Sequence, residues 1–291
     1  MPRCGFFWAC GTATHLRGED GMRRFLILTL ACAAFSGCAN PKEKFGRTWY
    51  IDGAGNWGFG VLDVPLGLED AGYKGFVSNY HWSLTMNPAL DQTLRFIARA
   101  SGSVLAGEIT DYLKRNPDAN ANIIALSAGT GVAVWAAEDL KPPYKINNII
   151  LVGSSISSRH DLRKALANMK GKFYCYYASS DPVLQGPVRL LGTIDGTYDD
   201  SAGLVGLRGQ GLNGGRVVNV GWSSRYTRLG WTGGHADCTN RRFVAGEIAK
   251  RIDPKLPAAK SKKAVKVASD DSGDKEAAPK DAAQAPAQTG T

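Results

Sequence analysis

The sequence lacks the patterns that hold metal ions or bind nucleic acids. Its 291 residues include only four histidines and six cysteines, and these form no CxxC pair and no His/Cys cluster with metal-ligand spacing. The formal net charge is +9, but the basic residues are spread along the chain and form no dense stripe, so nucleic acid is not an expected partner. We therefore expect no metal, no other cofactor and no nucleic-acid ligand.

An apolar run long enough to cross a bilayer, roughly 20 residues, is also missing near the N-terminus. The run FLILTLACAAF (25–35) has 11 residues and follows the basic stretch Met22-Arg23-Arg24. A basic region before a short apolar core is typical of a signal peptide. Residues 1–21 are polar, which is unusual before a signal peptide. Met22 is therefore a candidate for the true start of translation.

The end of this leader resembles the lipobox of bacterial lipoproteins. Ser36-Gly37-Cys38 places small residues before a cysteine, although Phe35 stands where that motif usually has leucine. The resemblance implies that residues 1–38 are a lipoprotein leader, that Cys38 is lipidated, and that the protein is tethered to a membrane. Ala39 after the cysteine then favours the outer membrane, facing the periplasm. The alternative is an ordinary secretory signal and a secreted protein.

The C-terminal segment 255–291 has no aromatic residue and is dominated by Ala, Lys, Pro, Asp and Ser. Such a composition buries too little apolar surface to offset the chain entropy lost on folding. We expect a disordered tail. Residues 45–254 remain, enough for one sizeable core.

Short apolar runs alternate with helix-like stretches across this core. Six runs have the character of buried parallel strands: 47–52, 75–83, 122–127, 147–155, 172–181 and 216–224. Helix-like stretches lie at 88–116, 131–140, 159–170 and 236–252, and segment 182–215 is Gly-rich and loop-like. This alternation predicts an α/β fold with a doubly wound, mostly parallel sheet of about six strands. Ligands of such sheets bind outside the carboxyl ends of the strands.

A serine stands at the end of the third apolar run. The sequence Ala125-Leu126-Ser127-Ala128-Gly129 turns from a strand into a helix through small residues. It resembles the G-x-S-x-G nucleophile elbow of the α/β-hydrolase fold, with alanine in place of the first glycine. In that elbow a strained turn projects the hydroxyl into the crevice, and the neighbouring residues must be small.

A serine nucleophile needs a base, and the base needs an acid that orients it. The α/β-hydrolase order is Ser, then Asp or Glu, then His, which selects Asp181 at the end of the fifth predicted strand and His235 before the last helix. His81 is an alternative base. We interpret His160 as a surface or capping residue. The competing acids are Asp195, Asp199, Asp200 and Asp237.

The resemblance also implies an oxyanion hole made by two backbone amides. One belongs to the residue after the nucleophile, Ala128, and the other to the Gly-rich loop after the first strand, for which we choose Ala54. Residues expected to line the substrate site are Gly53, Gly55, Trp57 and His81.

The chain thus resembles a small esterase, lipase or cutinase without a large cap domain. Little sequence precedes strand 47–52, and no cap-sized insertion follows strand 147–155. The resemblance implies a serine hydrolase that cleaves carboxylic esters through an acyl-enzyme. Two alternatives stay open: a non-catalytic envelope lipoprotein that uses this fold to bind a ligand, and an acyltransferase or thioesterase with the same triad.

Cysteine is scarce once the leader is set aside. If Cys38 carries lipid, only Cys175 and Cys238 remain as thiols. In an oxidising compartment they can form a disulfide, and two separate buried thiols are the alternative.

Overall fold

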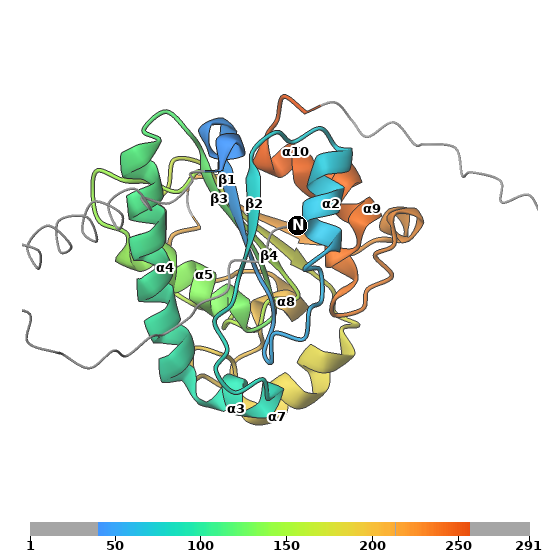
Figure 1. Ribbon diagram of the computed structural model, residues 1–291. Coiled ribbons are helices and arrows are strands. Elements are labelled where there is room, and N and C mark those ends of the chain that lie inside the picture. Colours follow the sequence, from blue (N-terminus) through green and yellow to red (C-terminus); the bar gives the residue numbers. More distant parts are fainter. Residues whose placement is uncertain (1–39, 213, 257–291) are drawn as a thin grey trace, which may run out of the picture. The chain divides into compact units, whose positions relative to one another are not determined.

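The structure of the protein is a computed structural model that describes residues 40–212 and 214–256 (Figure 1). Its centre is a sheet of six strands in the order β2-β1-β3-β4-β5-β6, and every neighbouring pair is parallel. The strands are β1 (Arg47–Ile51), β2 (Phe76–Tyr80), β3 (Ala121–Leu126), β4 (Asn148–Val152), β5 (Phe173–Tyr177) and β6 (Val217–Gly221). The predicted α/β fold with a mostly parallel sheet is confirmed.

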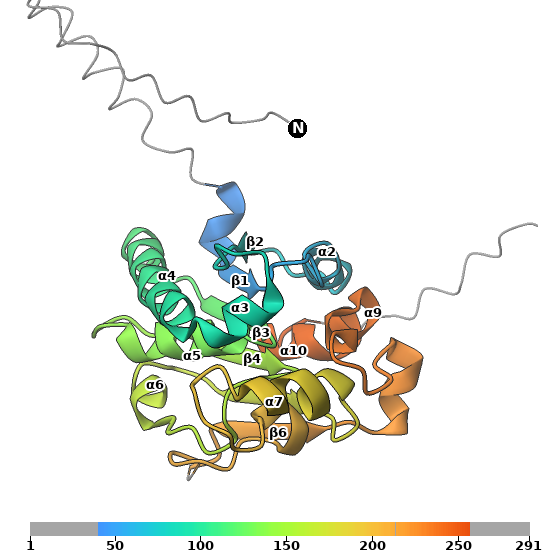
Figure 2. The ribbon, with the colours of Figure 1, turned by 90° about the horizontal axis from the view of Figure 1, so that it is seen from below.

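Helices cover both faces of the sheet (Figure 2). One face carries α4 (Arg95–Arg115), α5 (Gly129–Asp139) and α6 (Arg163–Ala167). The other carries α2 (Asp63–Asp70), α9 (Arg241–Phe243), η5 (Val244–Ile248) and α10 (Ala249–Ile252). In the described parts of the chain no large cap stands over the sheet, and no helix is long and apolar enough to cross a membrane.

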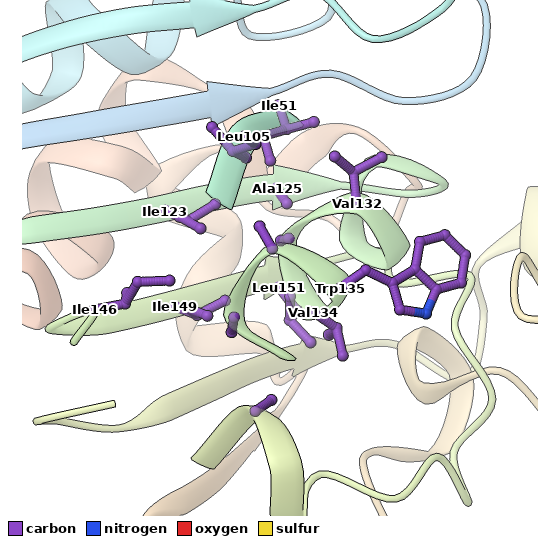
Figure 3. Close-up of a cluster of buried hydrophobic side chains, with 14 of the residues drawn as sticks. Ile51, Leu105, Ile123, Ala125, Val132, Val134, Trp135, Ile146, Ile149 and Leu151 are labelled. Carbon is purple, nitrogen blue, oxygen red and sulfur yellow. The ribbon is translucent and has the colours of Figure 1, made fainter. Parts of the chain in front are cut away.

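Alternate side chains of the strands explain the two helical layers. Ile123, Ala125, Ile149 and Leu151 pack against α4 and α5 (Figure 3). Their neighbours along the strands, such as Ile124 and Ile150, belong to the core on the opposite face. Successive strand residues point to opposite sides of a sheet, so strands that are apolar throughout must be covered on both faces.

Several helical elements differ from the prediction. The helix expected at 88–116 is divided into α3 (Pro88–Thr93) and α4, because Leu94 leaves the helical region with ψ 58°. Helix α2 was not expected. The Gly-rich segment 182–215 contains three short helical pieces, η2 (Leu184–Val188), α7 (Arg189–Leu191) and α8 (Ala202–Val205).

The order of the strands also indicates where a ligand binds. The chain winds from β1 outward to β2 and then returns to β3 on the other side of β1. In open α/β sheets the crevice lies at the carboxyl edge where the winding reverses. Here that point lies between the loop after β1 and the turn after β3, which holds Ser127. The domain boundaries at 45 and 254 stay predictions.

Candidate active site

Ser127 occupies the sharp turn between β3 and α5. Its φ of 52° lies in the left-handed region, which a residue with a side chain adopts only at a cost. Gly129 follows two residues later, and a Cβ there would lie 2.8 Å from Cγ2 of Ile51 and overlap the carbonyl oxygen of Asp52. Glycine therefore lets the turn lie against β1, and the turn has the strained geometry that the sequence pattern predicts.

His235 and Asp181 meet at the same edge of the sheet. The Nδ1 of His235 lies 2.8 Å from Oδ2 of Asp181, across 54 residues of sequence. Asp181 is only 2% exposed, and its other oxygen accepts hydrogen bonds from the amides of Val183 (3.0 Å) and Leu184 (3.1 Å). With Nδ1 donating to the carboxylate, the free lone pair of the imidazole is on Nε2.

The loop that carries His235 is shaped by a second carboxylate. Oδ2 of Asp237 accepts hydrogen bonds from the amides of Thr232 (2.9 Å) and Gly234 (3.0 Å). The imidazole then packs over Gly153, where a Cβ would lie 3.2 Å from Nδ1 and 2.7 Å from the carbonyl oxygen of His235. Glycine at the end of β4 thus makes room for the imidazole beside Asp181.

Ser127 and His235 line one cavity of about 460 Å³. This volume lies in the usual range for small-molecule sites. The rest of the lining is almost wholly apolar or backbone, with Gln92 as the remaining polar side chain: Gly53, Ala54, Trp57, Phe59, Pro88, Ala89, Gln92, Leu126, Val183, Pro187, Val188, Leu191 and Ala236. The cavity therefore suits an apolar group placed next to the Ser127 hydroxyl.

The Ser127 hydroxyl and the His235 imidazole are not hydrogen-bonded to each other. The Nε2 of His235 is buried and has no hydrogen-bond partner among the described residues. Catalytic hydrogen bonds are often long without substrate and tighten when it binds. Both side chains border the same cavity.

The proposed oxyanion amides also lie beside the serine. Ala128 precedes the first turn of α5, so its amide belongs to the N-terminal end of a helix, where negative charge is favoured. Ala54 lines the cavity, and the preceding Gly53 approaches so closely that its Cβ would lie 3.1 Å from Cβ of Ser127. Among residues 40–212 and 214–256, no protein acceptor pairs with either alanine amide.

Two buried carboxylates, which the sequence pattern did not reveal, hold the loop that carries Ala54. Asp52 accepts hydrogen bonds from the amides of Gly53 (2.8 Å) and Gly58 (2.7 Å). Asp91, on α3, accepts from the amide of Gly55 (2.7 Å). Burial raises the pKa of Asp52, and the hydrogen bonds from the backbone amides oppose that rise. These side chains fix the position of the loop beside Ser127.

Two of the expected lining residues lie elsewhere. The amide of Gly55 donates to Asp91, and Gly55 does not border the cavity, whereas Gly53 and Trp57 do. His81 is exposed at the end of β2 and borders a separate, much smaller cavity. The edge position of β2 explains this, because β1 separates it from β3 and Ser127.

The disulfide considered for Cys175 and Cys238 is wrong. Both residues are free and buried, and they belong to the cores on opposite faces of the sheet. Burial raises the pKa of the Cys175 thiol to about 12 and that of Cys238 well above its ordinary value. Both thiols are therefore protonated at neutral pH. Cys38 lies outside the described residues.

His160 is not the surface or capping residue that we expected. Its Nε2 lies 2.9 Å from Oε1 of Glu138 on α5, and its Nδ1 lies 2.9 Å from Oδ2 of Asp195. Burial alone would lower the pKa of His160, but hydrogen bonds to Asp195 and Glu138 raise it to about 9. Asp195 is therefore the hydrogen-bond partner of His160, and Asp199 accepts a hydrogen bond from the hydroxyl of Ser157. Neither carboxylate is paired with His235.

The sequence matches no model of a known protein family and no curated protein. The α/β fold with its six parallel strands is compatible with an α/β-hydrolase.

Proposed function

We propose that this protein is a serine hydrolase of the α/β-hydrolase type that cleaves carboxylic esters. The observation that carries the proposal is the meeting of three features at one apolar cavity. These are Ser127 held at positive φ, the hydrogen-bonded pair His235–Asp181, and the amides of Ala54, which lines the cavity, and of Ala128, which follows Ser127. The described residues supply neither amide with an acceptor. Nucleophile, base and oxyanion donors are the parts that acyl transfer requires.

In the proposed reaction, Oγ of Ser127 attacks the carbonyl carbon of the ester while Nε2 of His235 takes the hydroxyl proton. The carboxylate of Asp181 stabilises the imidazolium that forms, and its three hydrogen bonds keep it in place. The amides of Ala128 and Ala54 stabilise the oxyanion. The imidazolium then protonates the leaving alcohol, and a water activated by His235 hydrolyses the acyl-enzyme.

The lipid anchor at Cys38, with a periplasmic location at the outer membrane, remains a prediction. It depends on residues outside the described part of the chain. The catalytic proposal does not need it, because every group that it uses lies between Gly53 and His235.

The test is hydrolysis of p-nitrophenyl esters by purified protein and three variants. Ser127→Ala and His235→Ala should each lower kcat by at least a thousandfold, the order seen when a triad member is lost. His81→Ala is the matched control, since His81 lies outside the cavity, and should retain full activity. If correctly folded wild-type protein hydrolyses none of the esters, or if His81→Ala rather than His235→Ala abolishes hydrolysis, the proposal is wrong. The first outcome would favour the binding-module alternative.

A further inference from the structure

The mouth of the cavity is almost free of charge. It is formed mainly by segments 53–62, 82–90 and 182–191, each of which contributes lining residues. Together they contain one charged side chain, Arg189, although Asp, Glu, Lys and Arg make up 21% of the chain. Charged residues normally dominate exposed segments, so this face differs from ordinary protein surface.

Large apolar side chains take the place of charges on these segments. Seven of them are exposed, and we call this set the apolar rim: Trp57 (63%), Phe59 (51%), Leu62 (74%), Leu84 (81%), Met86 (69%), Leu90 (47%) and Leu190 (80%). The rings of Trp57 and Phe59 lie 6.5 Å apart, and Nε1 of Trp57 donates to the carbonyl of Met86 (3.2 Å). Trp57 and Phe59 also line the cavity. The rim therefore joins the cavity that holds Ser127 at Trp57 and Phe59.

Leu84 and Met86, the two most exposed rim residues of segment 82–90, lie on a hydrogen-bonded turn. Met86 has a φ of 53°, a conformation that costs energy for a residue with a long side chain. Its amide donates to Oγ of Ser83 (3.1 Å), and the hydroxyl of Thr85 donates to Asp91 (2.7 Å). Hydrogen bonds and a strained backbone therefore hold Leu84 and Met86 out in solvent, which is the opposite of what folding stability favours. Backbone strain of this kind concentrates at functional sites.

Helices α3 and α7 each carry one residue of the apolar rim, Leu90 and Leu190. They lie next to each other at the carboxyl edge of the sheet (Figure 1). Nε2 of Gln92, on α3, donates to the carbonyl of Gly192 directly after α7 (2.9 Å), and Arg95 donates to the carbonyl of Leu191 (3.1 Å). The segments that bear Leu90 and Leu190 are therefore joined by hydrogen bonds.

We propose that the apolar rim docks on the surface of an uncharged lipid phase and that the ester enters the cavity directly from that phase. This inference rests on the proposed function, because it names the physical state of the substrate. An apolar patch that surrounds an apolar cavity marks an interaction site. The only cation on these segments, Arg189, lies 3.8 Å from Asp200, so the patch offers little free positive charge. This favours a neutral acyl-lipid surface over an anionic membrane, which attracts Lys and Arg.

The test measures binding without turnover. Protein carrying Ser127→Ala is mixed with triolein droplets, the droplets are floated, and the bound fraction is measured against droplet concentration. The double variant Leu84→Ser/Met86→Ser, in the same background, should bind about tenfold more weakly, because it removes apolar area that docking takes from water. The matched control is Phe45→Ser/Val104→Ser, which removes two side chains of similar exposure (56% and 65%) outside the rim, and it should bind like the parent.

Two further measurements separate the outcomes. With Ser127 intact, both double variants should hydrolyse the water-soluble ester p-nitrophenyl acetate at the wild-type rate, which shows that they are folded and competent. Vesicles of phosphatidylglycerol should bind the parent protein less than triolein does. Equal droplet binding by the rim variant and the parent, no binding by the parent, or preference for the anionic vesicles would overturn the docking proposal. Droplet binding without any esterase activity would instead refute the proposed function and leave the rim as a lipid-binding surface.

Discussion

Replacing His160 with glutamine should remove a pH-dependent part of the stability of the fold. His160 is held between Glu138 and Asp195, and its pKa in the folded protein is about 9 against an ordinary value of 6.5. A raised pKa means that the folded state binds the proton more tightly. The contribution is therefore fully present below pH 6.5 and is lost as the pH rises toward 9.

The size of the effect follows from the two pKa values. The difference between about 9 and 6.5 corresponds to about 3 kcal/mol of unfolding free energy. Because the imidazole is mostly buried, with 16% of its side chain exposed, solvent screens these ion pairs less than pairs at the surface. The network ties α5, whose N-terminal end adjoins Ser127, to the segment around Asp195.

The measurement is urea denaturation of wild type and His160→Gln at pH 6 and at pH 9.5. The wild type should lose about 3 kcal/mol more between the two pH values than the variant does, and the variant should be clearly less stable at pH 6. The comparison cancels groups that titrate in both proteins, including the two buried thiols. If wild type and variant lose the same free energy over this interval, the assignment of a charged, doubly paired imidazole is refuted.

Three other predictions follow from the site. Asp181→Asn should lower kcat by about 10³ to 10⁴ with little change in KM, because the amide no longer stabilises the His235 cation; an unchanged kcat in the ester assay would contradict the pairing. Gly129→Ala should lower Tm by several degrees or prevent folding, because its Cβ overlaps the carbonyl oxygen of Asp52; thermal unfolding at the wild-type temperature would contradict the close approach. For p-nitrophenyl esters of increasing chain length, kcat/KM should rise about fourfold per methylene, the equivalent of about 0.8 kcal/mol, until the cavity is filled; a flat series would show that the acyl chain does not bind in it.

The main architecture could be predicted from the sequence because buried parallel strands have a recognisable local sequence pattern. Runs such as residues 123–126 are apolar throughout, and they alternate with helix-like stretches. Ser127 could be found because the turn after a strand demands small neighbours, and Gly129 supplies one. Asp181 and His235 could be selected because the chain order of a triad is constrained within this fold.

The supporting residues could not be predicted, because their partners are distant in sequence. His160 is 22 residues from Glu138 and 35 from Asp195. Asp91 is 36 residues from Gly55. A carboxylate that accepts hydrogen bonds from distant backbone amides produces no periodic pattern in the sequence. Only the folded structure identifies it. The break at Leu94 was hidden for a related reason, since a leucine there continues the apolar pattern of the helix.

The most direct test of the central claim is a covalent one. Folded protein is treated with a fluorophosphonate, digested, and mapped by mass spectrometry to locate the phosphonylated residue. We predict a single adduct on Ser127, formed slowly in Asp181→Asn and abolished in His235→Ala. An adduct on another residue, equal labelling of His235→Ala, or no labelling of folded wild-type protein would contradict the account of Ser127 as a nucleophile activated by His235.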